Sequence, residues 1–542
     1  MRTISLESTR EGAEENSTDN EEPPMIHTII ERQGSRPLAR EVDTCIERSV
    51  AYSLEHQTSS GSWEVLPDAR LFDTGFVTYA LSSAPRELVG SAVDRAKKWL
   101  ETARAQSHEP LARILEETPR AIVRGQDPID LRAPELYGKL FQRKTLLLYG
   151  LARHAGMEVL SPLSEDDVRA KVRATFDRRN HIVLKQWSRV DLVSVHVMLE
   201  FMAPDPSSSI SMTDAVRYLR SLQSDDGSFC HNPMSTAIAF LALSTVAPGS
   251  EAWRRSLQLL LDSQQPDGTW RFCTSAVWDT SLTVRSLRAA PLFRRRGLRP
   301  AVDFLDQSQN DDGGWGFHAD VESDNDTTSC VLLALQDSLD PTHTTIVRAV
   351  EYLLRRQRAD GLWNTWQSDD DRPVDDCVAH VVRSLTPFET QYDIDLAPAR
   401  RWLRERYGHG VGWSSGWYRM IPYSLLEVGR ALQAKQGIPP EARESIVALQ
   451  NSDGGWPGIS GETSRASATG LALAALMEHG SPQTPIVHAA LRYLIETQDS
   501  GGTWRGRPEM YGPRPLIYHL QTNTHAFASH GLISVWRRWS LE

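Results

Sequence analysis

The chain has 542 residues, of which 40% are hydrophobic and 24% are charged, and its formal net charge is −11. This length allows roughly two to four domains and a large buried core. The acidic balance argues against a nucleic-acid-binding surface, and no apolar run reaches the roughly 18 residues that a transmembrane helix needs.

Residues 1–24 are polar and acidic with almost no apolar content, so we expect a disordered tail there. The five cysteines are widely spaced and form no C-x-x-C pair, which argues against a disulfide framework and against a cysteine zinc site. From these features we expect a cytoplasmic protein.

An internal repeat occupies most of the chain. In most copies an aromatic residue or Leu is followed by Gln five residues later, by Gly four residues after that, and by Trp or Phe two residues further. One copy reads "AYSLEHQTSSGSW" (51–63) and another reads "FLDQSQNDDGGW" (304–315). The other copies end at Phe229, Trp270, Trp363, Trp456 and Trp504.

The spacing of the repeat indicates the architecture. Gln223, Gln264, Gln309 and Gln357 follow one another at intervals of 41, 45 and 48 residues. A period of roughly 40–50 residues fits a stacked pair of helices. The simplest role of the Gln, Gly and Trp is structural, because a glycine turn has to be tied to the next helix.

The segments that follow the turns are apolar on nearly all faces, for example "SATGLALAALMEHG" (467–480). Several of them begin with Asp, Ser or Thr, which are preferred helix N-caps. Such helices belong in a buried inner layer. Because no long alternating β pattern accompanies them, we predict an all-α fold of α/α barrels.

The repeat is missing for 166 residues between Gln57 and Gln223, although this stretch still reads as helical. A second domain inserted after the first repeat would explain the gap. We therefore predict an N-terminal part of one domain at 25–64, an inserted domain at 65–295, and the rest of the first domain at 296–542.

The stretch "SDNDTTSCVLLAL" (323–335) places two carboxylates at the start of one apolar helix. Helix capping alone would account for Asp324 and Thr327. Two neighbouring acids also suit a phosphatase nucleophile, a metal clamp, or a carboxylic acid that protonates an alkene. For the last of these, burial favours the neutral acid, and neighbouring hydrogen bonds orient its proton.

Together, the repeat and this motif resemble the class II terpene cyclases. That family has two α/α barrels, β and γ, with γ inserted near the N-terminus of β, and an Asp-x-Asp-Asp motif whose middle Asp is the general acid. The resemblance implies that Asp326 is the acid and that Asp324 and Thr327 hold its geometry. Thr327 replaces the last Asp, as in the D-x-D-T-T variant of drimane-type sesquiterpene cyclases.

A second stretch resembles the γ domain of copalyl diphosphate synthases, namely "VHVMLEFM" (195–202) with "LQSDDGSFCHNPMSTAIAFLAL" (222–243). The resemblance implies that Glu200 binds the substrate diphosphate together with Mg²⁺. We therefore expect a prenyl diphosphate to be cyclised to a bicyclic diphosphate. Farnesyl diphosphate giving a drimane skeleton is the first choice, and geranylgeranyl diphosphate giving a copalyl skeleton is the alternative. The residue that takes up the final proton stays open among His318, His380 and Tyr423.

Other chemistries fit the sequence less well. Asp324, Asp326 and Thr328 match a phosphatase motif, but no β-strand precedes them. The acidic stretch "SDDDRPVDDCVAH" (368–380) does not give the metal clamp of ionisation-type cyclases. Its Asp375, Cys377 and His380 are the residue types of a prenyltransferase zinc site, but they do not converge on one helix. A non-catalytic toroid that serves as a binding module remains the alternative outside the enzymes.

Overall fold

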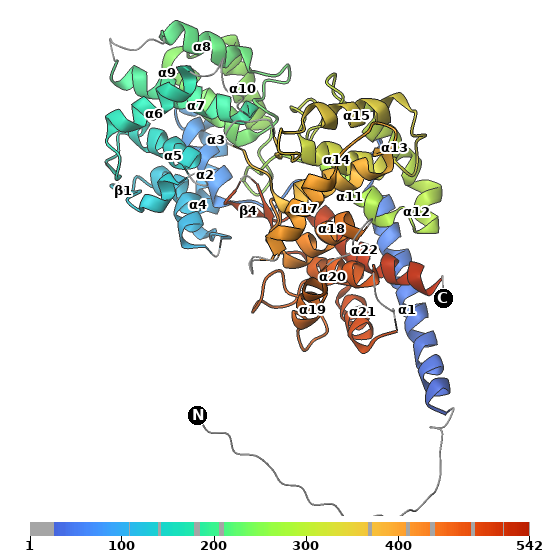
Figure 1. The fold of residues 1–542 in the computed structure, drawn as a ribbon. Helices are drawn as coiled ribbons and strands as arrows, with labels where there is room; N and C mark the ends of the chain where they lie inside the picture. Colours follow the sequence, from blue (N-terminus) through green and yellow to red (C-terminus); the bar gives the residue numbers. More distant parts are fainter. Residues whose placement is uncertain are drawn as a thin grey trace, which may run out of the picture.

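The computed structural model describes residues 26–107, 109–138, 142–177, 185–204, 211–366, 371–407, 412–433, 439–478, 483–512 and 514–540. It consists of two helical bodies that lie side by side (Figure 1). The disordered tail predicted at 1–24 lies outside the described residues. No helix in the described part of the chain is long and apolar enough to cross a membrane.

The first body is a closed ring of inner helices surrounded by outer helices. Each inner helix contacts the next one along the chain, and the last returns to the first. The inner helices are α11 (Ala276–Leu287), α14 (Asn325–Leu335), α16 (Asp375–Leu385), α18 (Ile421–Gln433), α20 (Ala466–Met477) and α22 (Gln521–Trp539). The outer layer contains α13 (Leu298–Gln307), α15 (Thr344–Arg355), α17 (Ala397–Arg406), α19 (Pro440–Ala448) and α21 (Pro485–Thr497).

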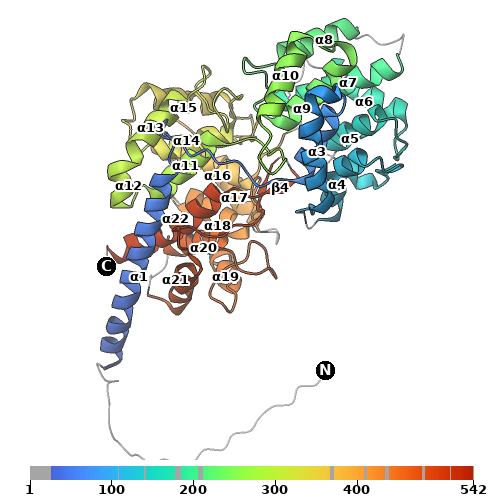
Figure 2. The ribbon, with the colours of Figure 1, turned by 180° about the vertical axis from the view of Figure 1, so that it is seen from behind.

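Helix α1 (Ile26–Glu55) completes the outer layer, although it is far from its neighbours in the sequence. It contacts α21, α22 and α12 (Pro291–Arg296), and Figure 2 shows it running along the outside of the first body next to these helices. Buried hydrogen bonds join it to α22, for example between Ser53 Oγ and His525 Nε2 at 2.9 Å.

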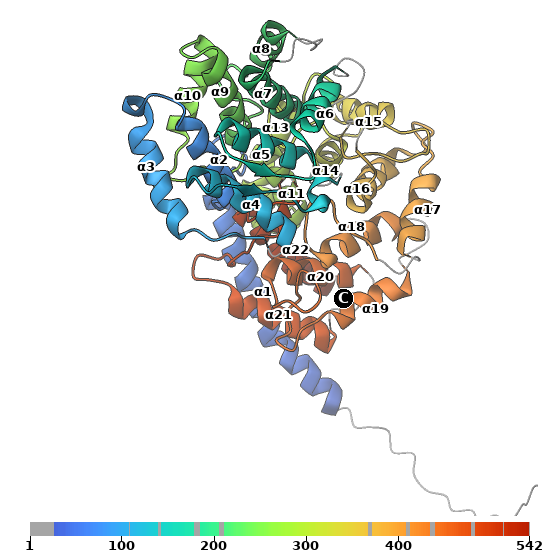
Figure 3. The same ribbon diagram turned by 90° about the vertical axis from the view of Figure 1, so that its left-hand side faces the viewer.

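The second body is built in the same way from a contiguous stretch of chain, and in Figure 3 it lies in front of the first. Its inner helices form a ring of α2 (Leu71–Leu81), α4 (Pro110–Val123), α5 (Gln142–His154), α7 (Gln186–Met202) and α9 (Pro233–Val246). Outside this ring lie α3 (Arg86–Thr102), α6 (Glu165–Asp177), α8 (Met212–Ser221) and α10 (Glu251–Asp262).

Strands are short in the described residues. β1 (Ile129–Asp130) pairs in parallel with β2 (Val159–Leu160) in the second body. β3 (Met510–Tyr511) pairs antiparallel with β4 (Ile517–Tyr518), with Met510 opposite Tyr518, and β4 lies between the two bodies. Single 3₁₀ turns occur at η1 (Pro134–Tyr137) and η2 (Thr386–Phe388).

Burial separates inner from outer helices as the sequence pattern predicts. Every residue of α14 is buried, whereas α15 buries a single stripe that includes Ile346, Val350 and Leu353. A helix that is apolar on all faces needs neighbours on all sides, and an amphipathic helix needs them on one.

The turn of each repeat ties three segments together, as the turn before α14 shows. The Gln309 amide donates to the carbonyls of Gly313 and Thr345, both at 2.9 Å, and the indole of Trp315 donates to the Leu305 carbonyl at 2.7 Å. Gly313 has φ +89°, and a Cβ there would lie 2.7 Å from the Arg348 carbonyl oxygen, so glycine is required.

Each body has its own hydrophobic core. The first core contains residues from Leu38 to Trp63 and again from Val277 to Val535. The second contains residues from Phe72 to Trp270 together with Leu516, from the loop between β3 and β4. The sequence placed the end of the inserted domain at residue 295, but the chain already rejoins the first body at α11. This helix belongs to the first body because it closes the inner ring between α14 and α22.

Candidate active site

A cavity of about 780 Å³ lies where the two bodies meet. The first body contributes Trp278, Asp324, Asp326 and Thr327, residues at the N-terminal ends of its inner helices. The second body and the crossing segments complete the wall, with Trp187, Cys230, Asn232, Met234, Phe272, Cys273 and Ser275. The remaining lining residues are mostly aromatic: Phe317, Trp366, Trp417, Met510, Tyr511, Gly512 and Tyr518.

Asp324 is the N-cap of α14. Its carboxylate accepts hydrogen bonds from the backbone N–H of Thr327 at 2.6 Å and from the Thr327 hydroxyl at 2.7 Å. Burial raises the pKa of Asp324 to about 8, and the charge of Asp326 adds to this, against the lowering effect of the Thr327 hydrogen bonds. Thr327 therefore fixes Asp324, and the structure shows no direct bond from its hydroxyl to Asp326.

Asp326 lies in the first turn of α14, is 1% exposed, and lines the cavity. Its Oδ1 lies 2.7 Å from Nδ1 of His380 on the neighbouring helix α16. Its Oδ2 is buried and has no hydrogen-bond partner among the described residues. One carboxylate oxygen is thus held in place, and the other is available to a molecule in the cavity.

His380 connects Asp326 to a buried charged network. Its Nε2 lies 3.3 Å from both the Tyr423 hydroxyl and the Glu427 carboxylate. Burial lowers the pKa of His380, but Cys330, Asp326 and Glu427 outweigh burial and raise that pKa well above 6.5.

Glu427 is fixed in turn by two arginines. It accepts from Arg285 at 2.8 Å and from Arg383. Burial raises the pKa of Glu427, but the charges of Arg285 and Arg383 outweigh it and hold the pKa well below 4.5. Glu427 is therefore a permanent anion behind His380 and favours the imidazolium form.

Asp375 and Asp376 of the second acidic stretch hold neighbouring segments together. Asp375 accepts from Arg406 and from the Ser414 N–H at 2.9 Å. Asp376 accepts from the Ser415 hydroxyl at 2.6 Å and from the Gly416 N–H at 2.8 Å. Burial, followed by the charge of Asp326, raises the pKa of Asp376. Both carboxylates join α16 to the loop before α18.

The zinc set considered from the sequence does not form. Among the described residues, the one group with three converging ligand atoms of metal-binding type is Asp326, Cys330 and His380, not Asp375, Cys377 and His380. The thiol of that group is a soft ligand and the imidazole a borderline one, unlike the oxygen ligands that Mg²⁺ prefers.

Glu200 does not join the other predicted site residues. It lies at the C-terminal end of α7, about 20 Å along the helix from the cavity residue Trp187 at 1.5 Å per residue. Its carboxylate lies 3.2 Å from Arg173 and 3.6 Å from Arg169 of α6. Two guanidinium groups at this distance repel a divalent cation, so these residues do not fit the predicted magnesium site.

The three residues considered as acceptors of the final proton lie in different places. His380 and Tyr423 lie behind Asp326 in the charged network. His318 contacts the Ala319 carbonyl at 2.8 Å, lies 3.6 Å from Glu64, and is not a residue of the cavity wall. Sequence reasoning missed the pairing of His380 with Asp326; the available signal was that the two residues lie on consecutive inner helices, Asp326 in the first turn of α14 and His380 in the middle of α16.

Comparison with known proteins gives two family matches. Residues 234–370 match the squalene-hopene cyclase C-terminal domain, and residues 423–511 match the prenyltransferase alpha-alpha toroid domain. A solved structure, the ent-copalyl diphosphate synthase from Streptomyces platensis, superposes with a TM-score of 0.55 at 17% identity, over 92% of this chain and 99% of that one. The predicted all-α fold of α/α barrels is thereby confirmed.

Curated relatives include two drimenyl diphosphate synthases. The one from Streptantibioticus cattleyicolor is 28% identical over 315 residues, and the one from Streptomyces showdoensis is 30% identical over 329 residues. These alignments cover 53% and 55% of this chain and 59% and 58% of the relatives. The chain thus matches about three fifths of the length of these relatives.

Proposed function

Because the chain is a relative of the class II terpene cyclases, we propose that it cyclises a linear prenyl diphosphate by protonation and leaves the diphosphate in place. The observation that carries this proposal is the buried carboxyl of Asp326, held on one oxygen by His380 and unpartnered on the other, in the wall of an aromatic cavity. The relatives' names favour farnesyl diphosphate as substrate and drimenyl diphosphate as product, with geranylgeranyl diphosphate and a copalyl product as the alternative.

In this mechanism the Oδ2–H of Asp326 protonates the terminal alkene. The alkene π electrons form the new C–H bond and leave a tertiary carbocation, which the next double bonds attack in turn to close two rings. Loss of a proton from the bicyclic cation forms the product alkene and restores the proton count. The imidazolium of His380 stabilises the Asp326 carboxylate that the first step leaves behind.

The cavity wall suits the cationic intermediates. Trp278 lies at the head of α11 and donates from its indole to the Tyr418 hydroxyl at 3.0 Å, so its ring is fixed. Trp417 also lines the cavity and is held edge-on against Trp366, with 4.8 Å between ring centroids. Aromatic faces attract carbocations and expose no nucleophile that would trap them.

The diphosphate is assigned to the side of the cavity that faces the second body. The ammonium of Lys185 lies 3.8 Å from the ring centroid of Trp366 and 5.8 Å from that of Trp187, and both rings line the cavity. A cation at this place suits the charged end of the substrate, and Asp326 suits the apolar end. Glu200 and Mg²⁺ have no role in this assignment.

The test is incubation of the purified chain with farnesyl or geranylgeranyl diphosphate in deuterated water, followed by dephosphorylation and mass spectrometry. We expect a bicyclic alcohol that carries one deuterium from the initiating protonation. Asp326→Asn should lower the rate by about 10²–10⁴-fold, the usual contribution of a general acid. The control Asp311→Asn, on an exposed turn, should be unaffected. No cyclic product from either substrate would refute the proposal.

A further inference from the structure

A second charged feature lies at the opposite end of the first body. The inner helices begin at the cavity and end at a pocket of about 930 Å³, which we call the arginine pocket. Its wall includes Arg285, Arg288, Arg383, Arg430, Arg537 and Arg538. This concentration of cations stands out in a chain whose net charge is −11.

The carboxylates near the arginine pocket do not balance it. Glu427 serves both Arg285 and Arg383, Asp337 lies 2.8 Å from Arg288, and Glu478 lies 2.6 Å from Arg430. The exposed Arg537 and Arg538 contact no carboxylate within the described ranges. The C-terminal end of α22 carries about half a negative charge, too little to offset both.

Other groups in the pocket are also poised for an anion. Burial, together with the charges of the neighbouring Arg285 and Arg430, lowers the pKa of Arg383 to about 10, against the raising effect of Glu427. Nδ1 of His530 is buried and has no hydrogen-bond partner in the described structure. The hydroxyls of Ser286 and Ser534 lie in the same wall.

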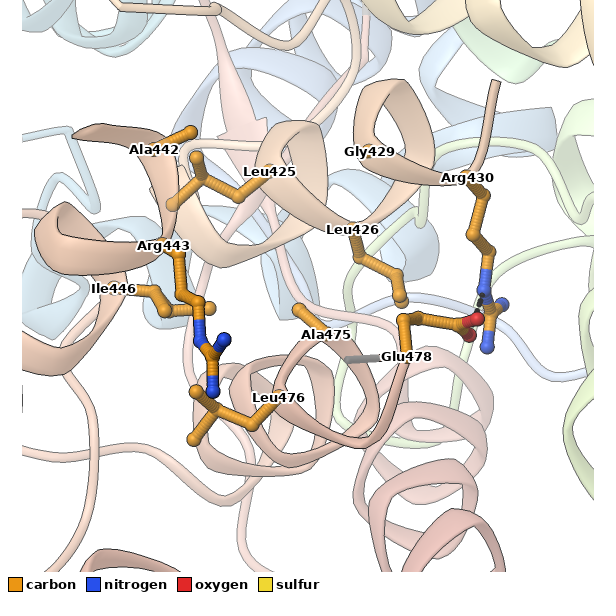
Figure 4. A pocket seen from close by; sticks show the side chains of 10 residues that line it. All are labelled: Leu425, Leu426, Gly429, Arg430, Ala442, Arg443, Ile446, Ala475, Leu476 and Glu478. Carbon is orange, nitrogen blue, oxygen red and sulfur yellow. Dashed lines mark hydrogen bonds and ion pairs between the residues drawn. The ribbon is translucent and has the colours of Figure 1, made fainter. Parts of the chain in front are cut away.

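An apolar groove adjoins the arginine pocket and shares Arg430 and Glu478 with it. This groove is formed by α18, α19 and α20. Figure 4 shows its apolar side chains Leu425, Leu426, Ile446, Ala475 and Leu476, with Arg443 on one side and the paired Arg430 and Glu478 on the other. A cationic pocket beside an apolar groove complements a molecule with an anionic head and a hydrocarbon tail.

We propose that the arginine pocket and the apolar groove form a second binding site for a prenyl diphosphate, separate from the cavity. The diphosphate lies among the arginines, whose planar groups bind phosphate oxygens in pairs, and the prenyl chain lies along the groove. The choice of ligand rests on the proposed function. Because Arg285 and Arg383 also hold Glu427 behind His380, an occupied site contacts the network that supports Asp326.

Binding without turnover tests this proposal, so its outcome does not depend on cyclase activity. Isothermal titration of the Asp326→Asn chain with farnesyl diphosphate should show binding at the cavity and at the second site. Arg537→Ala/Arg538→Ala should weaken the second site about tenfold or more, since each lost charged contact is a substantial part of the affinity. The matched control Arg294→Ala/Arg295→Ala, on exposed positions of α12, should retain both.

A second pair of measurements separates head from tail. Ala475→Trp fills the groove and should weaken farnesyl diphosphate at the second site while leaving inorganic diphosphate binding unchanged, which also shows that the variant is folded. Equal titrations of the Arg537/Arg538 variant and its control would overturn the proposal. The proposal would also be overturned if the arginines bound anionic phospholipid vesicles but did not bind farnesyl diphosphate. The pocket would then recognise a lipid headgroup.

Discussion

At the scale of single residues, the proposed acid Asp326 depends on groups that the motif around it does not contain. Asp326 is held by His380 from the next inner helix, and His380 is backed by Glu427 from the one after that. Each of these three helices contributes one side chain to a line that runs from the cavity to Arg285 and Arg383. The line matters because a carboxylic acid gives up a proton more readily when a cation stabilises the product carboxylate.

His380→Gln tests this line. Glutamine can still donate to Asp326 but cannot become a cation. We expect kcat to fall by about 10–100-fold, part of a typical acid–base contribution. Because the pKa of His380 is raised well above 6.5, wild-type kcat should decline as pH rises through that raised value. The variant should lack this decline, as measured by kcat–pH profiles of both proteins.

The same substitution has a signature in stability. A group whose folded pKa is raised contributes stability that is fully present below its unfolded pKa of about 6.5 and is lost as pH rises through the folded value. Urea unfolding at a series of pH values should therefore show this dependence in the wild type and its loss in His380→Gln. An unchanged pH dependence of the free energy of unfolding would contradict the assigned charge on His380.

The sequence singled out Asp326 as a candidate acid but did not identify its partners. The motif draws attention to Asp326 because two carboxylates precede an apolar helix. The contact with His380 depends on how α14 and α16 rotate against each other, which a single sequence does not contain. The surroundings of Glu200 were beyond the sequence for a related reason: a local match of residues 195–202 does not tell which end of α7 lies near the cavity, nor that Arg169 and Arg173 of α6 contact the carboxylate.

At the scale of elements, the repeat was predictable because its period and its glycine are local properties. The turn geometry at Gly313 recurs at Gly61, Gly227, Gly268, Gly361, Gly454 and Gly502, all with positive φ. Each of these turns delivers the chain from an outer helix to the start of an inner one. The inner helices that follow these turns within the first body therefore run in the same direction around its ring.

Gln309→Ala should destabilise the fold through the turn before α14. It removes hydrogen bonds to the Gly313 and Thr345 carbonyls. We expect a loss of about 1–3 kcal/mol in the free energy of unfolding, the usual effect of leaving buried partners unsatisfied. Chemical denaturation measures it, with the exposed neighbour Gln307→Ala as control. Equal stability of the two variants would show that the turn glutamines are dispensable.

At the scale of the whole molecule, the cavity exists only where the two bodies meet. Asp326 belongs to the first body, but Trp187, Asn232 and Met234 of the second body form another part of the cavity wall. Chain-length selection is therefore expected to reside in the second body. The domain limits read from the sequence stay approximate because helix α11, which looks like part of the preceding repeat, packs in the first core.

Met234→Trp tests where substrate length is measured. The larger side chain shortens the cavity from the second-body side without touching Asp326. We expect kcat/KM for geranylgeranyl diphosphate to fall at least about tenfold more than for farnesyl diphosphate, since the longer chain needs the lost space. Parallel assays with both substrates measure the ratio. If both fall equally, the second body does not set the length.

The placement of α1 against α22 has a consequence for protein synthesis. The second body is contiguous in the chain and can fold as soon as it leaves the ribosome, whereas α1 precedes it and must wait for α21 and α22. At 5–20 residues per second, this wait is roughly 25–90 s. During that interval the face of α1 that carries Val42, Ile46 and Val50 is a newly made apolar surface without its native partner, a natural client for a ribosome-associated chaperone.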